Sequence, residues 1–99
     1  MASGIQSKVA TADGGMSESL VLEEEGTVQI SCDDWTGMTA ALEGSVKGER
    51  WSAIQEFGVD IVASDNYMGL IDGNGRIRLN ITGYNGNPVY IDIAPKNKG

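Results

Sequence analysis

Apolar and polar residues alternate with a period of two along most of the chain after residue 18, and this pattern constrains the fold most. From residue 76 to residue 81, Ile77, Leu79 and Ile81 alternate with polar neighbours. Successive side chains of a strand point to opposite faces, so alternation of this kind predicts a half-buried strand. Strand-like runs occupy Ser19–Glu25, Thr27–Cys32, Thr39–Val46, Trp51–Ile54, Val59–Ala63, Tyr67–Ile71, Arg76–Ile81 and Val89–Ile93.

Turn signals separate these runs. Asn74-Gly75 and Asn85-Gly86 are typical of hairpins, because both residue types tolerate the positive φ of tight turns. The segments 35–37 and 47–49 also predict turns around their glycines. No segment keeps a helical period, although residues 51–57 have room for one helical turn. About seven or eight short strands predict an all-β fold, a single antiparallel β-sandwich of the immunoglobulin-like or jelly-roll-like kind.

Inward-facing positions of the predicted strands define the expected core. A sandwich buries the inner faces of both sheets, so one residue in two along each strand is expected to be buried. The core is predicted to contain Ile30, Leu42, Val46, Trp51, Ile61, Ile77, Leu79, Ile81, Ile91 and Ile93.

Residues 1–18 are rich in Ala, Ser, Gly and Thr and differ from the rest of the chain. So little apolar material predicts an extended N-terminal arm (1–18) in front of a sandwich domain (19–99). Our hypothesis is that the arm lies along an adjacent subunit and that the sandwich projects outward. The arm's partner-binding candidates are the apolar residues and its one charge that can pair with an acidic neighbour: Ile5, Val9, Met16 and Lys8.

The charge balance limits the partners. Fourteen acidic residues oppose seven basic ones, for a formal net charge of −7. Nucleic-acid binders need Lys and Arg to replace phosphate counterions, so no nucleic-acid partner is expected. An anionic membrane surface is disfavoured for the same reason, and no apolar run approaches the ~20 residues that span a bilayer. The acidity serves either solubility or binding to a basic partner surface.

Catalytic and metal-binding signatures are missing from the sequence. There is no histidine, and Cys32 is the single cysteine, so a buried apolar role is expected for it. No phosphate or dinucleotide loop occurs, and a carboxylate-only active site needs a cleft that a small sandwich rarely has. We therefore expect no enzyme activity, no cofactor and no metal. A signal peptide is also absent from residues 1–15, which predicts synthesis in a cytoplasm.

Two weaker signals allow alternatives. Residues 72–77 resemble the middle of a calcium loop, but Leu70 and Ile81 then fall at required ligand positions, so a hairpin turn is the better interpretation. Trp51 lies in an apolar run and is expected in the core. Trp35 follows Asp33-Asp34 in a turn, where it either packs at the sandwich edge or offers an exposed ring to a partner, such as a sugar.

The run from residue 35 to residue 93 resembles small β-sandwich accessory proteins of tailed bacteriophage particles. The resemblance is a pattern of strands and turns without a catalytic signature. It is carried by Trp35-Thr36-Gly37, Leu42-Glu43-Gly44-Ser45, Lys47-Gly48, Trp51, Ile54, Gly75-Arg76-Ile77-Arg78, Thr82-Gly83 and Val89-Tyr90-Ile91-Asp92-Ile93.

The resemblance implies a structural protein of the virion. The first expectation is a capsid decoration or cement subunit that binds the shell protein in many copies or as a homo-oligomer. The alternative is a fibre, baseplate or head–tail adaptor module that binds a receptor glycan or another virion protein. A non-viral interaction domain is the third interpretation. The residues do not indicate which part of the particle the protein would occupy, in how many copies or with which symmetry.

Overall fold

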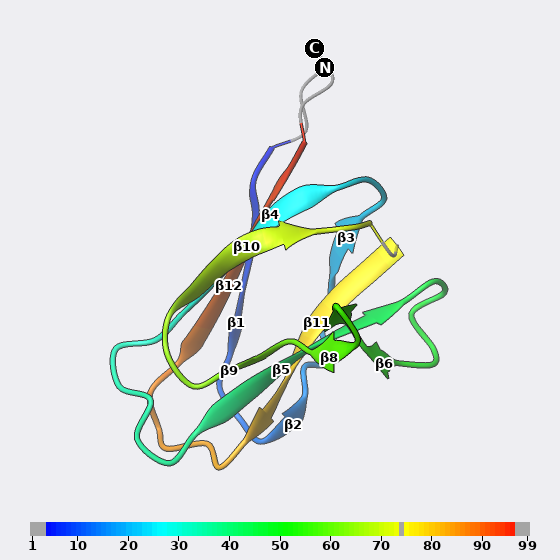
Figure 1. Ribbon diagram of the computed structural model, residues 1–99. Coiled ribbons are helices and arrows are strands. Elements are labelled where there is room, and N and C mark those ends of the chain that lie inside the picture. Colours follow the sequence, from blue (N-terminus) through cyan, green and yellow to red (C-terminus); the bar gives the residue numbers. More distant parts are fainter. Residues whose placement is uncertain (1–3, 74, 97–99) are drawn as a thin grey trace.

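The computed structural model describes residues 4–73 and 75–96, and these residues form a β-sandwich without helices (Figure 1). Sheet A is four-stranded and has the spatial order β1 (Gln6–Ala10), β12 (Val89–Pro95), β4 (Gly26–Ser31) and β10 (Tyr67–Ile71). Sheet B has the order β2 (Gly14–Gly15), β11 (Gly75–Thr82), β5 (Thr39–Ser45) and β6 (Ser52–Ala53), with β3 (Leu20–Leu22) on β11 and β9 (Val62–Ala63) on β5. A separate pair consists of β7 (Gln55–Glu56) and β8 (Val59–Asp60).

The predicted all-β sandwich is confirmed, and each of the eight predicted runs contains a strand. All pairings are antiparallel among the described residues. The helical turn that residues 51–57 had room for does not form. Ile54 donates its N–H to Leu42 O and accepts one from Ile61 N, which holds this segment beside β5 as short strands.

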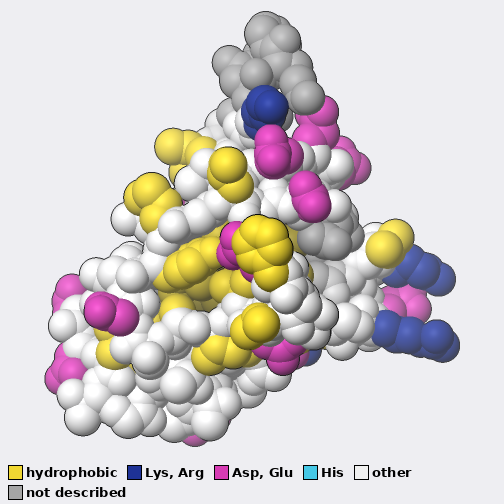
Figure 2. Space-filling model, in the orientation of Figure 1, with side chains coloured by type: hydrophobic (Ala, Val, Ile, Leu, Met, Phe, Trp, Pro, Cys, Tyr) yellow, Lys and Arg dark blue, Asp and Glu magenta, His cyan; other side chains and the backbone are white. Residues whose placement is uncertain are grey.

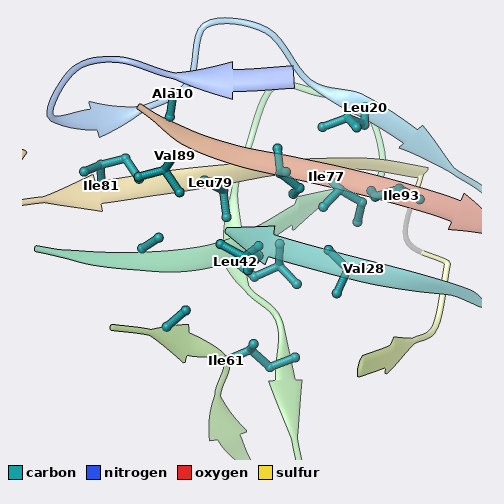
Figure 3. Close-up of a cluster of buried hydrophobic side chains, with 14 of the residues drawn as sticks. Ala10, Leu20, Val28, Leu42, Ile61, Ile77, Leu79, Ile81, Val89 and Ile93 are labelled. Atoms are coloured by element: carbon teal, nitrogen blue, oxygen red, sulfur yellow. The ribbon is translucent and has the colours of Figure 1, made fainter. Parts of the chain in front are cut away.

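The core lies between the two sheets, where inward side chains from both converge (Figure 3). Leu79 of β11 lies directly opposite Leu42 of β5, and Ile91 of β12 lies opposite Ile30 of β4. All four are fully buried. Burial is confirmed for eight predicted core residues: Ile30, Leu42, Ile61, Ile77, Leu79, Ile81, Ile91 and Ile93. Cys32 is also buried, as expected.

The other two core predictions, Val46 and Trp51, are wrong. Strand β5 ends at Ser45, whose Oγ accepts a hydrogen bond from Gly48 N at 2.8 Å, so Val46 lies in a turn and is 87% exposed. Trp51 is half-buried, and its ring lies 4.3 Å from the guanidinium carbon of Arg78. Since Arg78 alternates with two buried residues, it points out of sheet B, and Trp51 packs outside the core.

The glycines predicted for tight turns have positive φ, +95° at Gly75 and +93° at Gly86. The hairpins predicted there are nevertheless wrong, because each turn links strands of different sheets. The turn at Gly75 carries the chain from β10 in sheet A to β11 in sheet B, and the turn at Gly86 carries it back to β12. Asn85 does not share the positive φ, and Asn74 lies outside the described residues. A tight hairpin instead joins β7 and β8 through Phe57 and Gly58, both of positive φ.

The arm prediction is wrong for residues 4–18. Strand β1 pairs with β12 along its whole length, and Gly14–Gly15 pairs with β11. Ala10 is 3% exposed and belongs to the core. Backbone pairing supplies the hydrogen bonds that fix this segment, so it needs few apolar side chains to be ordered. The sandwich therefore starts before Ser19, and the hypothesis that this segment lies along a neighbouring subunit loses its basis.

Candidate functional site

A metal site is the first kind of functional site to consider in the part of the chain that the structure describes. No group of three or more His, Cys, Asp or Glu side chains there is placed to hold a metal ion. Asp34 acts as a turn residue, as expected, since its carboxylate accepts hydrogen bonds from Thr36 N at 2.9 Å and Thr36 Oγ1 at 2.6 Å. These bonds hold the pKa of Asp34 below its usual value. Within the same residues, no helix is suited to crossing a membrane.

One lateral side of the sandwich, between β1 and β3, is closed by side chains. The Gln6 amide donates a hydrogen bond to Val21 O and accepts one from Val21 N at 3.0 Å, which links the edges of the two sheets. Lys8, also on β1, forms an ion pair at 3.8 Å with Glu18, which lies between β2 and β3. A lysine on an edge strand discourages pairing with another chain.

The opposite lateral side is open. It lies between β10, the outer strand of sheet A, and the segment of β6, β7, β8 and β9 at the border of sheet B. A cleft of about 790 Å³ occupies this side. Figure 2 shows a hollow with a hydrophobic floor between β10 and the β7–β8 hairpin. The apolar residues that line the cleft are Ala53, Ile54, Ile61, Ile71, Leu70 and Val46.

Acidic groups occur around the same cleft. Glu25, Glu56 and Asp72 belong to its lining, together with the basic side chains Lys47 and Arg50. The two bases lie in the turn between β5 and β6, and Lys47 forms an ion pair with Glu49 at 4.0 Å.

Tyr67, the first residue of β10, is half-buried and packs against the core beside this side of the sandwich. Burial, followed by the charge of Glu56, raises the pKa of Tyr67 above its usual value. Leu70 and Ile71 of β10 and Gln55 and Glu56 of β7 line the same cleft, so the cleft lies between an apolar edge strand and a hairpin that carries an acidic residue.

Strand β10 itself has the properties of an unprotected edge. Its sequence, Tyr-Met-Gly-Leu-Ile, contains no charge and no proline. Met68 and Leu70 are 63% and 65% exposed. Among the described residues β10 pairs with β4 alone, so its second backbone edge faces the open side. Proteins usually protect such an edge with charges, proline or a covering element.

The outer face of sheet A extends this apolar surface. It is formed by the outward residues of four strands: Ser7, Val9, Thr27, Gln29, Ser31, Met68, Leu70, Tyr90, Asp92 and Ala94. Val9 lies directly opposite Tyr90, and each is 46% exposed. The one charged group of the face, Asp92, accepts a hydrogen bond from Ser7 Oγ. The outer face of sheet B is different, because it carries the Arg78–Glu43 ion pair at 2.8 Å.

The sequence-predicted partner residues of the N-terminal segment do not form one site. Ile5, 72% exposed, precedes β1, and Val9 lies on the outer face of sheet A. Lys8 is engaged with Glu18. Met16 packs against the core, and its sulfur accepts the N–H of Leu79 at 3.3 Å.

Trp35, the remaining predicted site residue, lies in the loop between β4 and β5 and packs against the core. Its Nε1–H donates a hydrogen bond to Asn66 Oδ1 at 3.0 Å. The same oxygen accepts the backbone N–H of Cys32 at 3.0 Å. Of the two interpretations of Trp35, packing at the sandwich edge matches these contacts.

Met68 and Leu70 were not among the predicted site residues, although the sequence contains a signal for them. Residues 67–71 are apolar on both faces of the strand, unlike the alternating run at 76–81. An exposed apolar face of this kind is unusual for a protein surface and marks a candidate interaction surface.

Comparison of the chain with protein-family models, with curated proteins and with solved structures finds no match, so the resemblance to phage structural proteins stays a prediction and no family membership is shown.

Proposed function

We propose that this protein is a non-enzymatic attachment protein that binds another protein through its open side. The observation that supports this most is β10, an uncharged edge strand that exposes Met68 and Leu70 beside a cleft with an apolar floor. The setting we propose, from the resemblance, is a tailed-phage particle, with the chain as a decoration or cement subunit that binds the capsid shell in many copies. Neither nucleic acid nor membrane is part of this proposal.

The exposed side chains of β10 suit protein binding energetically. Complete burial of a Met or Leu side chain contributes about 1.5–3 kcal/mol, and two thirds of each is still exposed here. Covering both therefore contributes on the order of 2–4 kcal/mol, or roughly 30- to 1,000-fold in affinity. The outer face of sheet A adds Val9 and Tyr90 to the surface that a partner can cover.

Charge favours a partner surface that is neutral over β10 and basic around it. The net charge of −7 repels acidic surfaces, whereas β10 places no charge in the contact itself. Complementary charges at the rim accelerate association and make it sensitive to salt. Glycan binding through Trp35 receives less support, because the indole N–H is already bonded to Asn66 and the ring packs on the core.

Co-sedimentation with DNA-free shells of the parent phage tests this function. We expect the wild-type chain to saturate the shells, and the double variant Met68→Thr/Leu70→Thr to bind at least tenfold more weakly. Threonine keeps the strand propensity of β10 and removes the apolar surface. The matched control is Val21→Thr, a residue 38% exposed on β3 of the other sheet, which is expected to bind like wild type. Equal binding of the double variant and the control, or no binding by wild type, refutes the proposal.

A further inference from the structure

The hydrogen-bonding pattern of β4 identifies which backbone groups of β10 are free. Lys96 N donates to Glu25 O, so the odd-numbered residues of β4 direct their backbone groups toward β12. Cys32 N donates to the side chain of Asn66, next to β10, so the even-numbered residues face β10. Backbone groups of a strand alternate between its two neighbours in this way.

The partners of those even-numbered residues follow from the register. Ile30 lies opposite Tyr67, and Val28 lies opposite Gly69. Residues 67, 69 and 71 therefore exchange hydrogen bonds with β4, and the N–H and C=O groups of Met68 and Leu70 point to the open side. Within the described residues no other strand pairs there. Four backbone groups, two donors and two acceptors, are thus presented in one row.

A strand added at this row would cover the cleft. Side chains of a sheet alternate between its faces, so every second residue of an incoming strand would point to the inner face of sheet A. The cleft lies at that position, with Ile54 and Ile61 in its lining. Its volume of about 790 Å³ falls within the usual range of ligand pockets. Backbone pairing and side-chain burial would therefore occur together.

We propose that the open side binds an extended segment of the partner protein by strand addition. The segment becomes a fifth strand of sheet A next to β10 and places alternate apolar side chains in the cleft. Basic residues at its ends match the net charge of −7 of the chain and the carboxylate of Asp65, which lies just before β10. This inference rests on the proposed function and specifies the kind of contact that the partner makes.

A second copy of this chain fits the open side less well. In a β10–β10 pairing the inward residues of the added strand would be Tyr67, Gly69 and Ile71 of the other copy. Tyr67 and Ile71 already pack on their own core, so they leave the cleft unfilled. Two chains of charge −7 also repel each other, and Glu56 and Asp72 line the cleft of each. A foreign basic segment avoids both penalties.

The test uses the full chain and synthetic peptides, with binding measured by calorimetry. The probe is acetyl-Lys-Val-Thr-Val-Thr-Val-Lys-amide, and its reference replaces the three valines by threonine. Paired residues of an antiparallel ladder share a face, so threonines opposite Met68 and Leu70 point outward and their N–H groups donate to β10. A peptide N-methylated at both threonines therefore loses these bonds. One N-methylated at the two valines that follow them keeps the bonds and is the matched control.

We expect the valine peptide and its valine-methylated control to bind at least tenfold more tightly than the other two peptides. On the protein side, Leu70→Pro removes one free-edge donor and spares the bonds to β4, so it is expected to weaken binding at least tenfold. The methylated peptides act on the wild-type protein, so they decide the question even where Leu70→Pro does not fold.

Equal binding of the two methylated peptides, or equal binding of the valine and threonine peptides, overturns strand addition by a foreign segment. A β10-linked dimer in sedimentation velocity would overturn it as well, because a second copy of the chain would then be the added strand. Shell binding is measured without peptides. Loss of peptide binding with intact shell binding therefore refutes strand addition alone, and the reverse result refutes the proposed attachment function alone.

Discussion

Replacing one leucine that points into the core and one that points outward tests the assigned inner and outer faces of the strands. Leu79 in β11 is fully buried opposite Leu42, and the N–H of Leu79 meets the sulfur of Met16. Truncation of a buried leucine to alanine costs about 2–5 kcal/mol because it removes buried methyl groups and leaves a cavity. We expect Leu79→Ala to fall near the middle of this range, since neighbours enclose the side chain on all sides. The same substitution at Leu70, 65% exposed, is expected to cost less than about 1 kcal/mol.

Urea unfolding followed by tryptophan fluorescence measures both variants against wild type. A small domain has a total stability of about 5–15 kcal/mol, so Leu79→Ala removes a large share of it. Its melting temperature should fall by roughly 10–30 °C, while that of Leu70→Ala falls by a few degrees. The slope with urea should stay unchanged in both, because a changed slope indicates a change in compactness. Equal costs for the two substitutions, or a larger cost at Leu70, would refute the assigned inner and outer faces.

Three further perturbations follow from the turns and from Tyr67. Gly75→Val should cost at least about 1–2 kcal/mol in urea unfolding, since φ is +95° and a Cβ there would lie 3.0 Å from Val46 O; a neutral effect contradicts the turn geometry. Burial raises the folded-state pKa of Tyr67, so its contribution to stability is present below the unfolded value of 10.0 and is lost as pH rises through the folded pKa. Absorbance titration should show one tyrosine that ionises at a higher pH than usual, and this late transition should be missing in Tyr67→Phe. The absence of such a transition in wild type contradicts the prediction. Thermal stability should not respond to EGTA, because Leu70 and Ile81 occupy positions where a calcium loop needs oxygen ligands; a drop of several degrees that calcium reverses contradicts this.

The sequence predicted the sandwich and eight of its buried core residues, because period-two alternation indicates directly which side chains are buried. Ile77, Leu79 and Ile81 show this, since each points inward between polar neighbours. Val46 shows the limit of the pattern: it continues the alternation of β5 for one residue beyond the strand's end. Burial depends on where a strand stops, and there the hydrogen bond from Gly48 to Ser45 decides it.

Topology was less accessible from the sequence. Asn-Gly pairs indicate tight turns, but a tight turn joins strands of one sheet or of two, and the local residues do not distinguish these cases. Strand β1 was missed because its side chains are small or polar, and its order comes from backbone bonds to β12, far along the chain. The open side was missed for a related reason. Only the spatial order of the strands shows that the apolar strand β10 lies at an edge.

Amide hydrogen exchange of β10, in the free chain and on DNA-free shells, tests most directly whether the open side is the binding surface. In the free chain, the N–H groups of Tyr67, Gly69 and Ile71 should exchange slowly, because they are bonded to β4, and those of Met68 and Leu70 should exchange fast. On the shells, mass spectrometry that resolves single amides should find Met68 and Leu70 protected at least tenfold. Binding that leaves these two amides as fast as in the free chain, while another surface becomes protected, would contradict the proposal.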